Sequence, residues 1–176
     1  MSTLYQNLMG TEFSQLAPLL QRFHIELGKD WVGEAHIIWC KNPLLRALLW
    51  LARLPKEANR QPITVHITPG DNNEKWTRRF GPCHMASKQK LQGPGLKESF
   101  GPFALTLDSH IQQGALHQSC SRSGLLGIPL PTRFTFKITA REWQENERFH
   151  FDVQIGLASL SLIRYRGWLL PISLEA

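Results

Sequence analysis

The second half of the chain alternates apolar and polar residues in short runs separated by turn residues. From Ile63 to Leu170 almost no segment has the 3.6-residue period of a helix. The connections carry turn residues such as Gly81-Pro82, Gly93-Pro94-Gly95 and Gly101-Pro102. Links this short join antiparallel neighbours, because a parallel crossover needs about a dozen residues or more. The pattern therefore predicts an antiparallel sheet built from successive hairpins.

Nine segments of this ladder are typical of strands: 63–67, 75–80, 83–91, 96–100, 103–111, 115–121, 134–143, 149–157 and 160–168. Alternate residues are apolar in at least three of them, as in Phe149, Phe151, Val153 and Ile155. A wide sheet with one continuous apolar side must be covered or must close on itself. We therefore predict an α+β fold whose strongly curved antiparallel sheet has about eight or nine strands and forms a half-barrel or a barrel.

The first third of the chain supplies the helices. Residues 3–27 have helical spacing with a break at Gly10, residues 31–39 are typical of a strand, and residues 44–54 of a short helix. Nothing indicates a second domain, so residues 1–176 are predicted to form one domain, with the strand ladder over 63–170. The 44–54 helix is apolar nearly all round. It is either buried against the sheet or held in a membrane interface, with Trp50 at head-group level.

Composition limits the compartment. The chain has 176 residues, and 42% of them are apolar, which excludes a disordered composition. Three widely spaced cysteines, Cys40, Cys83 and Cys120, do not form a disulfide framework, and their pattern indicates reduced thiols in the cytoplasm. The N-terminus lacks the features of a signal peptide. No apolar run approaches the roughly 20 residues of a spanning helix, so no transmembrane segment is predicted.

Charge and motifs exclude several classes of partner. The net charge is +6, but the basic residues are scattered and form no stripe, so no nucleic acid is predicted. The seven histidines show no metal-ligand spacing with each other, with cysteine or with carboxylates. No glycine-rich phosphate loop is present, so neither a metal nor another cofactor is predicted.

Arginines beside apolar residues are the first candidate ligand-binding groups. Arg164 and Arg166 share a strand face with Trp168, and Arg78 lies in another strand. A guanidinium next to apolar groups suits a carboxylate or phosphate, because it can bind two oxygens at once. We therefore hypothesise that these arginines orient the head group of an acidic ligand with an apolar tail. The alternative is an internal ion pair with Glu98 or Glu142.

Glu142 is the candidate residue for catalysis. It stands where the apolar face of the 134–143 strand ends, and a carboxylate there could act as a general acid or base. The alternative is a strand-end residue that lies in water or pairs with an arginine.

Six phrases, in order along nearly the whole chain, carry a family resemblance: Leu4-Tyr5-Gln6-Asn7-Leu8-Met9-Gly10, Trp76-Thr77-Arg78-Arg79-Phe80-Gly81, Glu98-Ser99-Phe100-Gly101-Pro102, Leu126-Gly127-Ile128-Pro129-Leu130-Pro131, Phe149-His150-Phe151-Asp152-Val153 and Arg164-Tyr165-Arg166-Gly167-Trp168-Leu169. With them the chain resembles the bacterial family called domain of unknown function 4166. The resemblance implies that members stand alone or follow an NAD(P)-binding, saccharopine dehydrogenase-like domain. It implies no catalytic residues.

The sequence therefore predicts a module that binds a small apolar or amphipathic acidic ligand inside a curved sheet. The predicted ligand-binding residues are Arg78, Glu142, Arg164, Arg166 and Trp168. One alternative is an enzyme, or an accessory domain of an NAD(P)-dependent oxidoreductase, that uses Glu142 with Arg164 and Arg166. The other is a structural module without a ligand.

Overall fold

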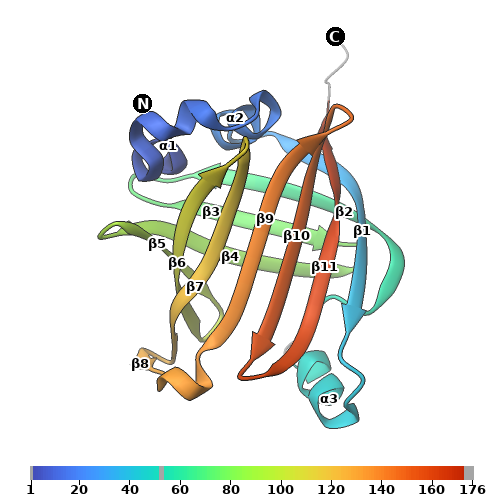
Figure 1. Cartoon of the computed structure of the whole chain (residues 1–176). Coiled ribbons are helices and arrows are strands. Elements are labelled where there is room, and N and C mark those ends of the chain that lie inside the picture. Colours follow the sequence, from blue (N-terminus) through green and yellow to red (C-terminus); the bar gives the residue numbers. More distant parts are fainter. Residues whose placement is uncertain (1, 52–53, 173–176) are drawn as a thin grey trace.

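A single antiparallel sheet of eleven strands dominates the computed structural model, which describes residues 2–51 and 54–172 (Figure 1). The strands are β1 (Asp30–Trp39), β2 (Ala58–Pro69), β3 (Glu74–Phe80), β4 (Cys83–Gln92), β5 (Gly95–Phe100), β6 (Phe103–Gln112), β7 (Ala115–Leu125), β8 (Ile128–Pro129), β9 (Phe136–Glu145), β10 (Arg148–Leu157) and β11 (Leu160–Pro171).

Ten of these strands close into a barrel. Their order is β6-β5-β4-β3-β2-β1-β11-β10-β9-β7, and the pairing of β6 with β7 completes the ring. The two-residue strand β8 pairs only with the end of β7. An eight-stranded barrel has an interior that side chains can just fill, and the diameter grows with the number of strands. A ten-stranded barrel therefore has more interior than its own side chains need to occupy.

The predicted fold needs correction in three respects. Eight or nine strands are too few, the sheet is a closed barrel and not a half-barrel, and the fold is mostly β rather than α+β. The strand predicted over residues 31–39 is β1, which joins the ring between β2 and β11. The strand β2 also begins earlier than the strand predicted over residues 63–67, because Pro62, Gln61 and Ala58 pair with Glu34, Ala35 and Ile37 of β1.

The helices cover the two ends of the barrel (Figure 1). At one end lie α1 (Leu4–Met9), the 3-10 helix η1 (Gly10–Gln15) and α2 (Pro18–Ile25). At the other lie α3 (Pro43–Leu51) and the 3-10 helix η2 (Thr132–Phe134). The helix predicted over residues 44–54 corresponds to α3, and its positions Ala52 and Arg53 lie outside the described residues.

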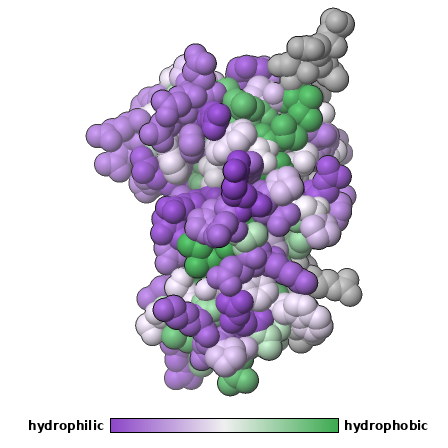
Figure 2. Space-filling model, turned by 90° about the vertical axis from the view of Figure 1, so that its right-hand side faces the viewer, coloured by the Kyte–Doolittle hydropathy of each residue, from purple (hydrophilic) through white to green (hydrophobic). Residues whose placement is uncertain are grey.

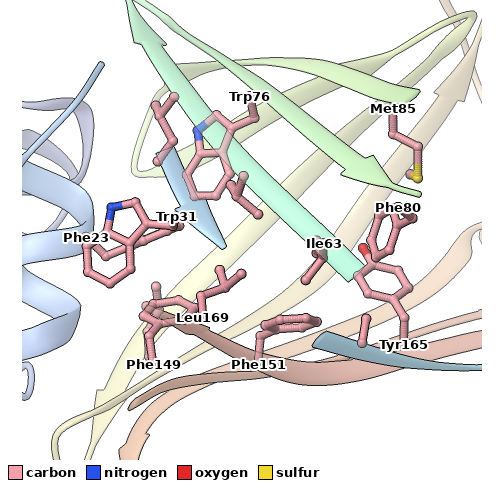
Figure 3. Close-up of a cluster of buried hydrophobic side chains, with 14 of the residues drawn as sticks. Phe23, Trp31, Ile63, Trp76, Phe80, Met85, Phe149, Phe151, Tyr165 and Leu169 are labelled. Atoms are coloured by element: carbon pink, nitrogen blue, oxygen red, sulfur yellow. The ribbon is translucent and has the colours of Figure 1, made fainter. Parts of the chain in front are cut away.

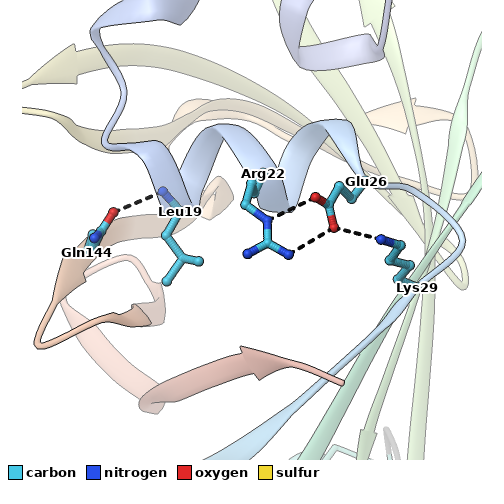
Figure 4. Close-up of polar contacts among 5 residues, drawn as sticks. All are labelled: Leu19, Arg22, Glu26, Lys29 and Gln144. Atoms are coloured by element: carbon cyan, nitrogen blue, oxygen red, sulfur yellow. Dashed lines mark hydrogen bonds and ion pairs between the residues drawn. The ribbon is translucent and has the colours of Figure 1, made fainter. Parts of the chain in front are cut away.

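The α2 end is tied down by hydrogen bonds to the strand connections. The backbone N–H of Leu19 donates to the Gln144 side chain at 2.9 Å, as Figure 4 shows, and that of Ala17 donates to the Gly114 carbonyl at 2.9 Å. At the exposed side of α2, Glu26 pairs with Arg22 and Lys29. These contacts fix α2 across the mouth, so its apolar face points into the barrel.

That apolar face plugs the α2 end. Phe23 is buried against Trp31 of β1, with ring centroids 5.0 Å apart, and against Phe149 of β10 at 4.2 Å. Figure 3 shows this cluster beside the helices, with Phe80 and Tyr165 farther along the interior. Aromatic side chains fill much volume, so this end of the barrel is closely packed.

Candidate functional site

The inward faces of β9 and β10 line a hollow. Phe136, Ile138 and Ala140 alternate with exposed polar residues along β9, yet they are only half-buried. Val153 and Ile155 of β10 are half-buried in the same way. All five line one cavity. Apolar side chains that point inward and remain accessible show that the interior is not filled.

The cavity has a volume of about 550 Å³ and a predominantly apolar lining. It reaches from the plug residue Phe23 to Leu45 and Leu49 of α3. Pockets for small ligands typically hold roughly 300–1,000 Å³ and carry a few well-placed polar groups on a hydrophobic wall. The cavity therefore has the size and the lining of a site for a small apolar molecule.

A belt of polar side chains crosses this apolar wall. Arg78 of β3 donates to the Ser87 hydroxyl of β4 at 2.9 Å and approaches the Glu98 carboxylate of β5 at 3.4 Å. The Arg78 side chain is 18% exposed, and it lines the cavity. Its guanidinium also lies over the Trp76 ring, 4.8 Å from the centroid. Arg78 thus has the internal carboxylate partner that was the alternative to a ligand head group.

Around Arg78, negatively charged groups outnumber positively charged ones. Burial on its own lowers the pKa of Arg78, but the field of Glu98 and of other nearby acidic groups raises this pKa overall. The guanidinium therefore stays charged. Glu98 and Glu142 both line the cavity with it. One arginine faces two carboxylates here.

Glu142 meets a buried histidine at the α2 end of the cavity. Its Oε2 lies 2.9 Å from Nε2 of His24, a residue of α2 that is fully buried. The Nδ1 atom of His24 has no hydrogen-bond partner among the described residues. The Tyr5 ring stacks on this imidazole at 3.9 Å, and its hydroxyl donates to Gln89 at 3.2 Å. This group joins α1, α2, β4 and β9 around one end of the cavity.

Both tyrosines of the chain lie in this interior. Burial raises the pKa of Tyr165 to about 12, although the Arg78 charge opposes that shift. Burial, together with the charges of Glu142, Glu98 and Glu74, raises the pKa of Tyr5 well above its ordinary value. Both phenols therefore remain neutral hydrogen-bonding groups on the cavity wall at physiological pH.

The five predicted ligand-binding residues lie on two sides of the barrel wall. Arg78 and Glu142 face the cavity. Arg164 pairs with Asp152 across neighbouring strands. Arg166 and Trp168 line a separate groove of about 370 Å³ on the outer face, beside Trp143 and His150. The structure thus brings Arg166 and Trp168 together, and Arg78 with Glu142, but it does not join these two pairs.

Sequence reasoning missed most of the polar belt. Ser87, Gln89 and Gln118 are polar and buried, and the two glutamines line the cavity. The signal in β4 was the exposed Lys88 and Lys90, which must point outward and so turn Gln89 inward. His24 gave no such signal, because its partner Glu142 is 118 residues away.

Metal ligation has no basis in the described residues, where no group of three or more His, Cys, Asp or Glu side chains could hold an ion. The candidate site consists of the apolar wall and the polar belt.

The fold and the cavity define a closed antiparallel β-barrel with a hollow, mostly apolar interior. The chain belongs to the family described as a domain of unknown function, DUF4166, whose profile matches residues 16–169. No curated protein matches the sequence.

Solved structures that resemble the chain include the following two. One is a protein of unknown function from the DUF3598 family of Nostoc punctiforme, with a TM-score of 0.52 and 13% identity; the match covers 84% of this chain and 48% of that one. The chain therefore spans about half the length of that protein. The other is Rv2717c from M. tuberculosis, with a TM-score of 0.49 and 13% identity over 90% of this chain and 99% of that one. At such identities the first likeness concerns the fold alone.

Proposed function

We propose that this barrel binds a small, mainly apolar molecule in the cavity between α2 and α3. The observation that carries the proposal is the unfilled apolar space of about 550 Å³ inside a closed sheet, with a belt of polar groups on its wall. An apolar space of this size is costly to leave empty, because its lining loses van der Waals contacts. A ligand with apolar bulk would restore them.

The polar belt favours an uncharged polar end on the ligand. A carboxylate placed against Arg78 would also meet Glu98, which already lies 3.4 Å from the guanidinium. Glu142 adds a second carboxylate to the same wall. Like charges at short range in a low-dielectric interior repel strongly. A hydroxyl or carbonyl avoids that repulsion and can still bond to Arg78, Gln89 or Gln118. We thus modify the acidic ligand predicted from the sequence, since Arg164 and Arg166 lie on the outer face.

Competition binding tests both parts of the proposal. The neutral dye Nile red would be titrated into the purified protein and then displaced with dodecanol or with dodecanoate. We expect dye emission to rise on binding, and dodecanol to displace the dye at lower concentration than dodecanoate. Native mass spectrometry of protein purified from cells would reveal a co-purified ligand directly.

Matched variants locate the binding. Ala140→Phe adds a ring on the cavity wall, whereas Thr139→Phe adds the same ring on the exposed face of the same strand. We expect Ala140→Phe to weaken dye binding at least roughly tenfold, because the ring occupies ligand space, and Thr139→Phe to bind as the wild type does. Thermal melting would verify that both variants fold. Equal affinity in two folded variants would contradict a ligand site in the cavity.

A second candidate function is acid–base catalysis by Glu142. The observation that favours it is the 2.9 Å contact of its carboxylate with the fully buried His24, on the wall of a mostly apolar cavity. A co-purified ligand incubated with the protein distinguishes the two. A binding module leaves the co-purified ligand chemically unchanged. An enzyme converts the ligand to a product, and the Glu142→Gln variant does not.

A further inference from the structure

Exposed large apolar side chains gather at the α3 end of the barrel. The most exposed are Leu126 at 77%, Leu44 at 76%, Ile128 at 69% and Trp50 at 64%. They come from α3 and from the β7–β8 turn, on either side of the same barrel mouth in Figure 1. Leu125 at the end of β7, Phe134 of η2 and Leu160 at the start of β11 are exposed at the same end. On the face that Figure 2 shows, most atoms are hydrophilic; hydrophobic atoms reach the lower tip of the molecule and also gather near its upper end. An apolar rim of this kind marks an interaction surface.

The charges of the two ends differ. Among the described residues of the connections at the α3 end, 40–51, 54–57, 81–82, 101–102, 126–135 and 158–159, the basic residues are Lys41, Arg46, Lys56 and Arg133 and the acidic one is Glu57. At the α2 end, residues 2–29, 70–73, 93–94, 113–114 and 146–147 carry the basic Arg22 and Lys29 against the acidic Glu12, Glu26, Asp71 and Glu147. The apolar rim is thus set among mainly positive charges.

The apolar rim is continuous with the cavity through α3. Leu45 and Leu49 of this helix line the cavity, while Leu44 and Trp50 of the same helix face outward. The helix therefore has one apolar side on the hollow and another on the solvent. An apolar molecule that moves past α3 would pass from the apolar rim outside the barrel to the apolar cavity inside it.

We propose that the α3 end of the barrel docks on an anionic lipid surface. Apolar side chains that enter the head-group region, ringed by lysine and arginine, are the recognised basis of reversible binding to such surfaces. No helix among the described residues is long and apolar enough to cross a bilayer, so the docking is peripheral. The lipid surface also supplies the apolar ligand to the cavity, and this second step rests on the function proposed above.

Charge argues against a second copy of the chain as the occupant. Two barrels that met rim to rim would bring Lys41, Lys56 and Arg133 of one copy toward those of the other. Like charges brought together at an interface cost free energy and slow association. An anionic surface presents the opposite charge and has none of this cost.

Vesicle co-sedimentation tests the docking. The protein would be mixed with vesicles of phosphatidylcholine alone, or of phosphatidylcholine with phosphatidylglycerol. We expect binding to the anionic vesicles only, and weaker binding at high salt, which screens the attraction. Leu126→Glu and Leu44→Glu should each weaken binding by roughly tenfold, since each removes apolar area and adds repulsion. Ile25→Glu, at 44% exposure on α2, is the matched control and should bind as the wild type does.

Three results would overturn the proposal. One is equal binding by Leu126→Glu and Ile25→Glu, and another is no preference for anionic vesicles. The third is a wild-type dimer in analytical ultracentrifugation that Leu126→Glu dissociates, together with no vesicle binding. The Ala140→Phe variant separates the two proposals. If it binds vesicles normally but takes up no dye, docking and the cavity both stand. If the wild type docks but takes up no dye, docking stands alone.

Discussion

At the scale of single residues, the barrel places charges where an ordinary core has none. Arg78 and Glu98 form an ion pair whose two side chains are mostly removed from water. Such a pair is weak evidence of stability, because desolvation of both charges offsets much of their attraction. Under the proposed function, its position on an otherwise apolar cavity wall would let it recognise a polar group on a ligand.

The buried tyrosines permit a prediction at this scale. The chain has two tyrosines, and burial raises the pKa of both, that of Tyr165 to about 12. Between the unfolded value near 10 and the folded value, the unfolded chain has lost protons that the folded protein retains, so the stability falls as pH rises. For Tyr165 the loss amounts to roughly 2–3 kcal/mol. Below pH 10 this contribution is fully present.

Absorbance of tyrosinate, followed against pH together with circular dichroism, measures this. We expect no tyrosinate signal near pH 10 while the sheet is intact, and then a joint rise with unfolding. Tyr165→Phe should reduce the pH dependence of the free energy of unfolding in this range. Titration of either tyrosine near pH 10 in a folded protein would refute the burial described here.

At the scale of elements, two glycines let β1 and β11 lie close together. A Cβ on Gly167 would lie 2.0 Å from the Glu34 carbonyl oxygen and 2.9 Å from the Phe151 ring. A Cβ on Gly33 would lie 1.8 Å from the Trp168 carbonyl oxygen. The obstacles are mainly backbone atoms of the partner strand, which cannot move without opening the sheet. These glycines therefore permit the close pairing that completes the ring on this side.

Gly167→Ala should accordingly lower the free energy of unfolding by roughly 3 kcal/mol or more, as overpacking against backbone does. Chemical denaturation would measure it. Gly127→Ala is the control, because a Cβ there meets nothing within 4 Å and the cost is only that of its φ of +83°, about 1–2 kcal/mol. Equal losses in the two variants would show that the β1–β11 contact is not tight.

At the scale of the whole molecule, the barrel is solid at the α2 end and hollow toward α3. Phe23, Trp31 and Phe149 pack together at the α2 end, while Phe136 and Ile138 face open space. Local stability follows the number of buried apolar contacts. The α3 end should therefore be the part of the barrel that opens, which is where a ligand would have to enter.

Hydrogen exchange followed by mass spectrometry tests this asymmetry. We expect amides of α3 to exchange at least tenfold faster than those of α2, and addition of dodecanol to slow the exchange of α3 selectively. Peptides from β10 and β11 serve as the slow reference. If the amides of α3 exchange as slowly as those of α2, the prediction that a ligand enters at the α3 end is contradicted.

The alternation of apolar and polar residues along the sequence already determines much of the fold. The turns at Gly81-Pro82, Gly93-Pro94-Gly95 and Gly101-Pro102 correctly predict the β3–β4, β4–β5 and β5–β6 hairpins, because turn chemistry and alternation are local. The family follows from phrases spread over the chain. Arg164, Arg166 and Trp168 share a face as predicted, since side chains alternate along the regular part of a strand.

Only the tertiary structure decided which face of each strand is inside and where the sheet closes. Arg166 and Trp168 face outward because Tyr165 and Leu169 of the same strand point into the barrel, and alternation alone permits either choice. Leu162 faces the cavity, in spite of its spacing from Arg164, because the β10–β11 register shifts between Ile155 and Gly156. Closure through β6–β7 and β1–β11, and the meeting of His24 with Glu142, depend on contacts between residues distant in the chain. Local patterns do not encode such contacts, because their free energy comes from burial that exists only once the barrel has formed.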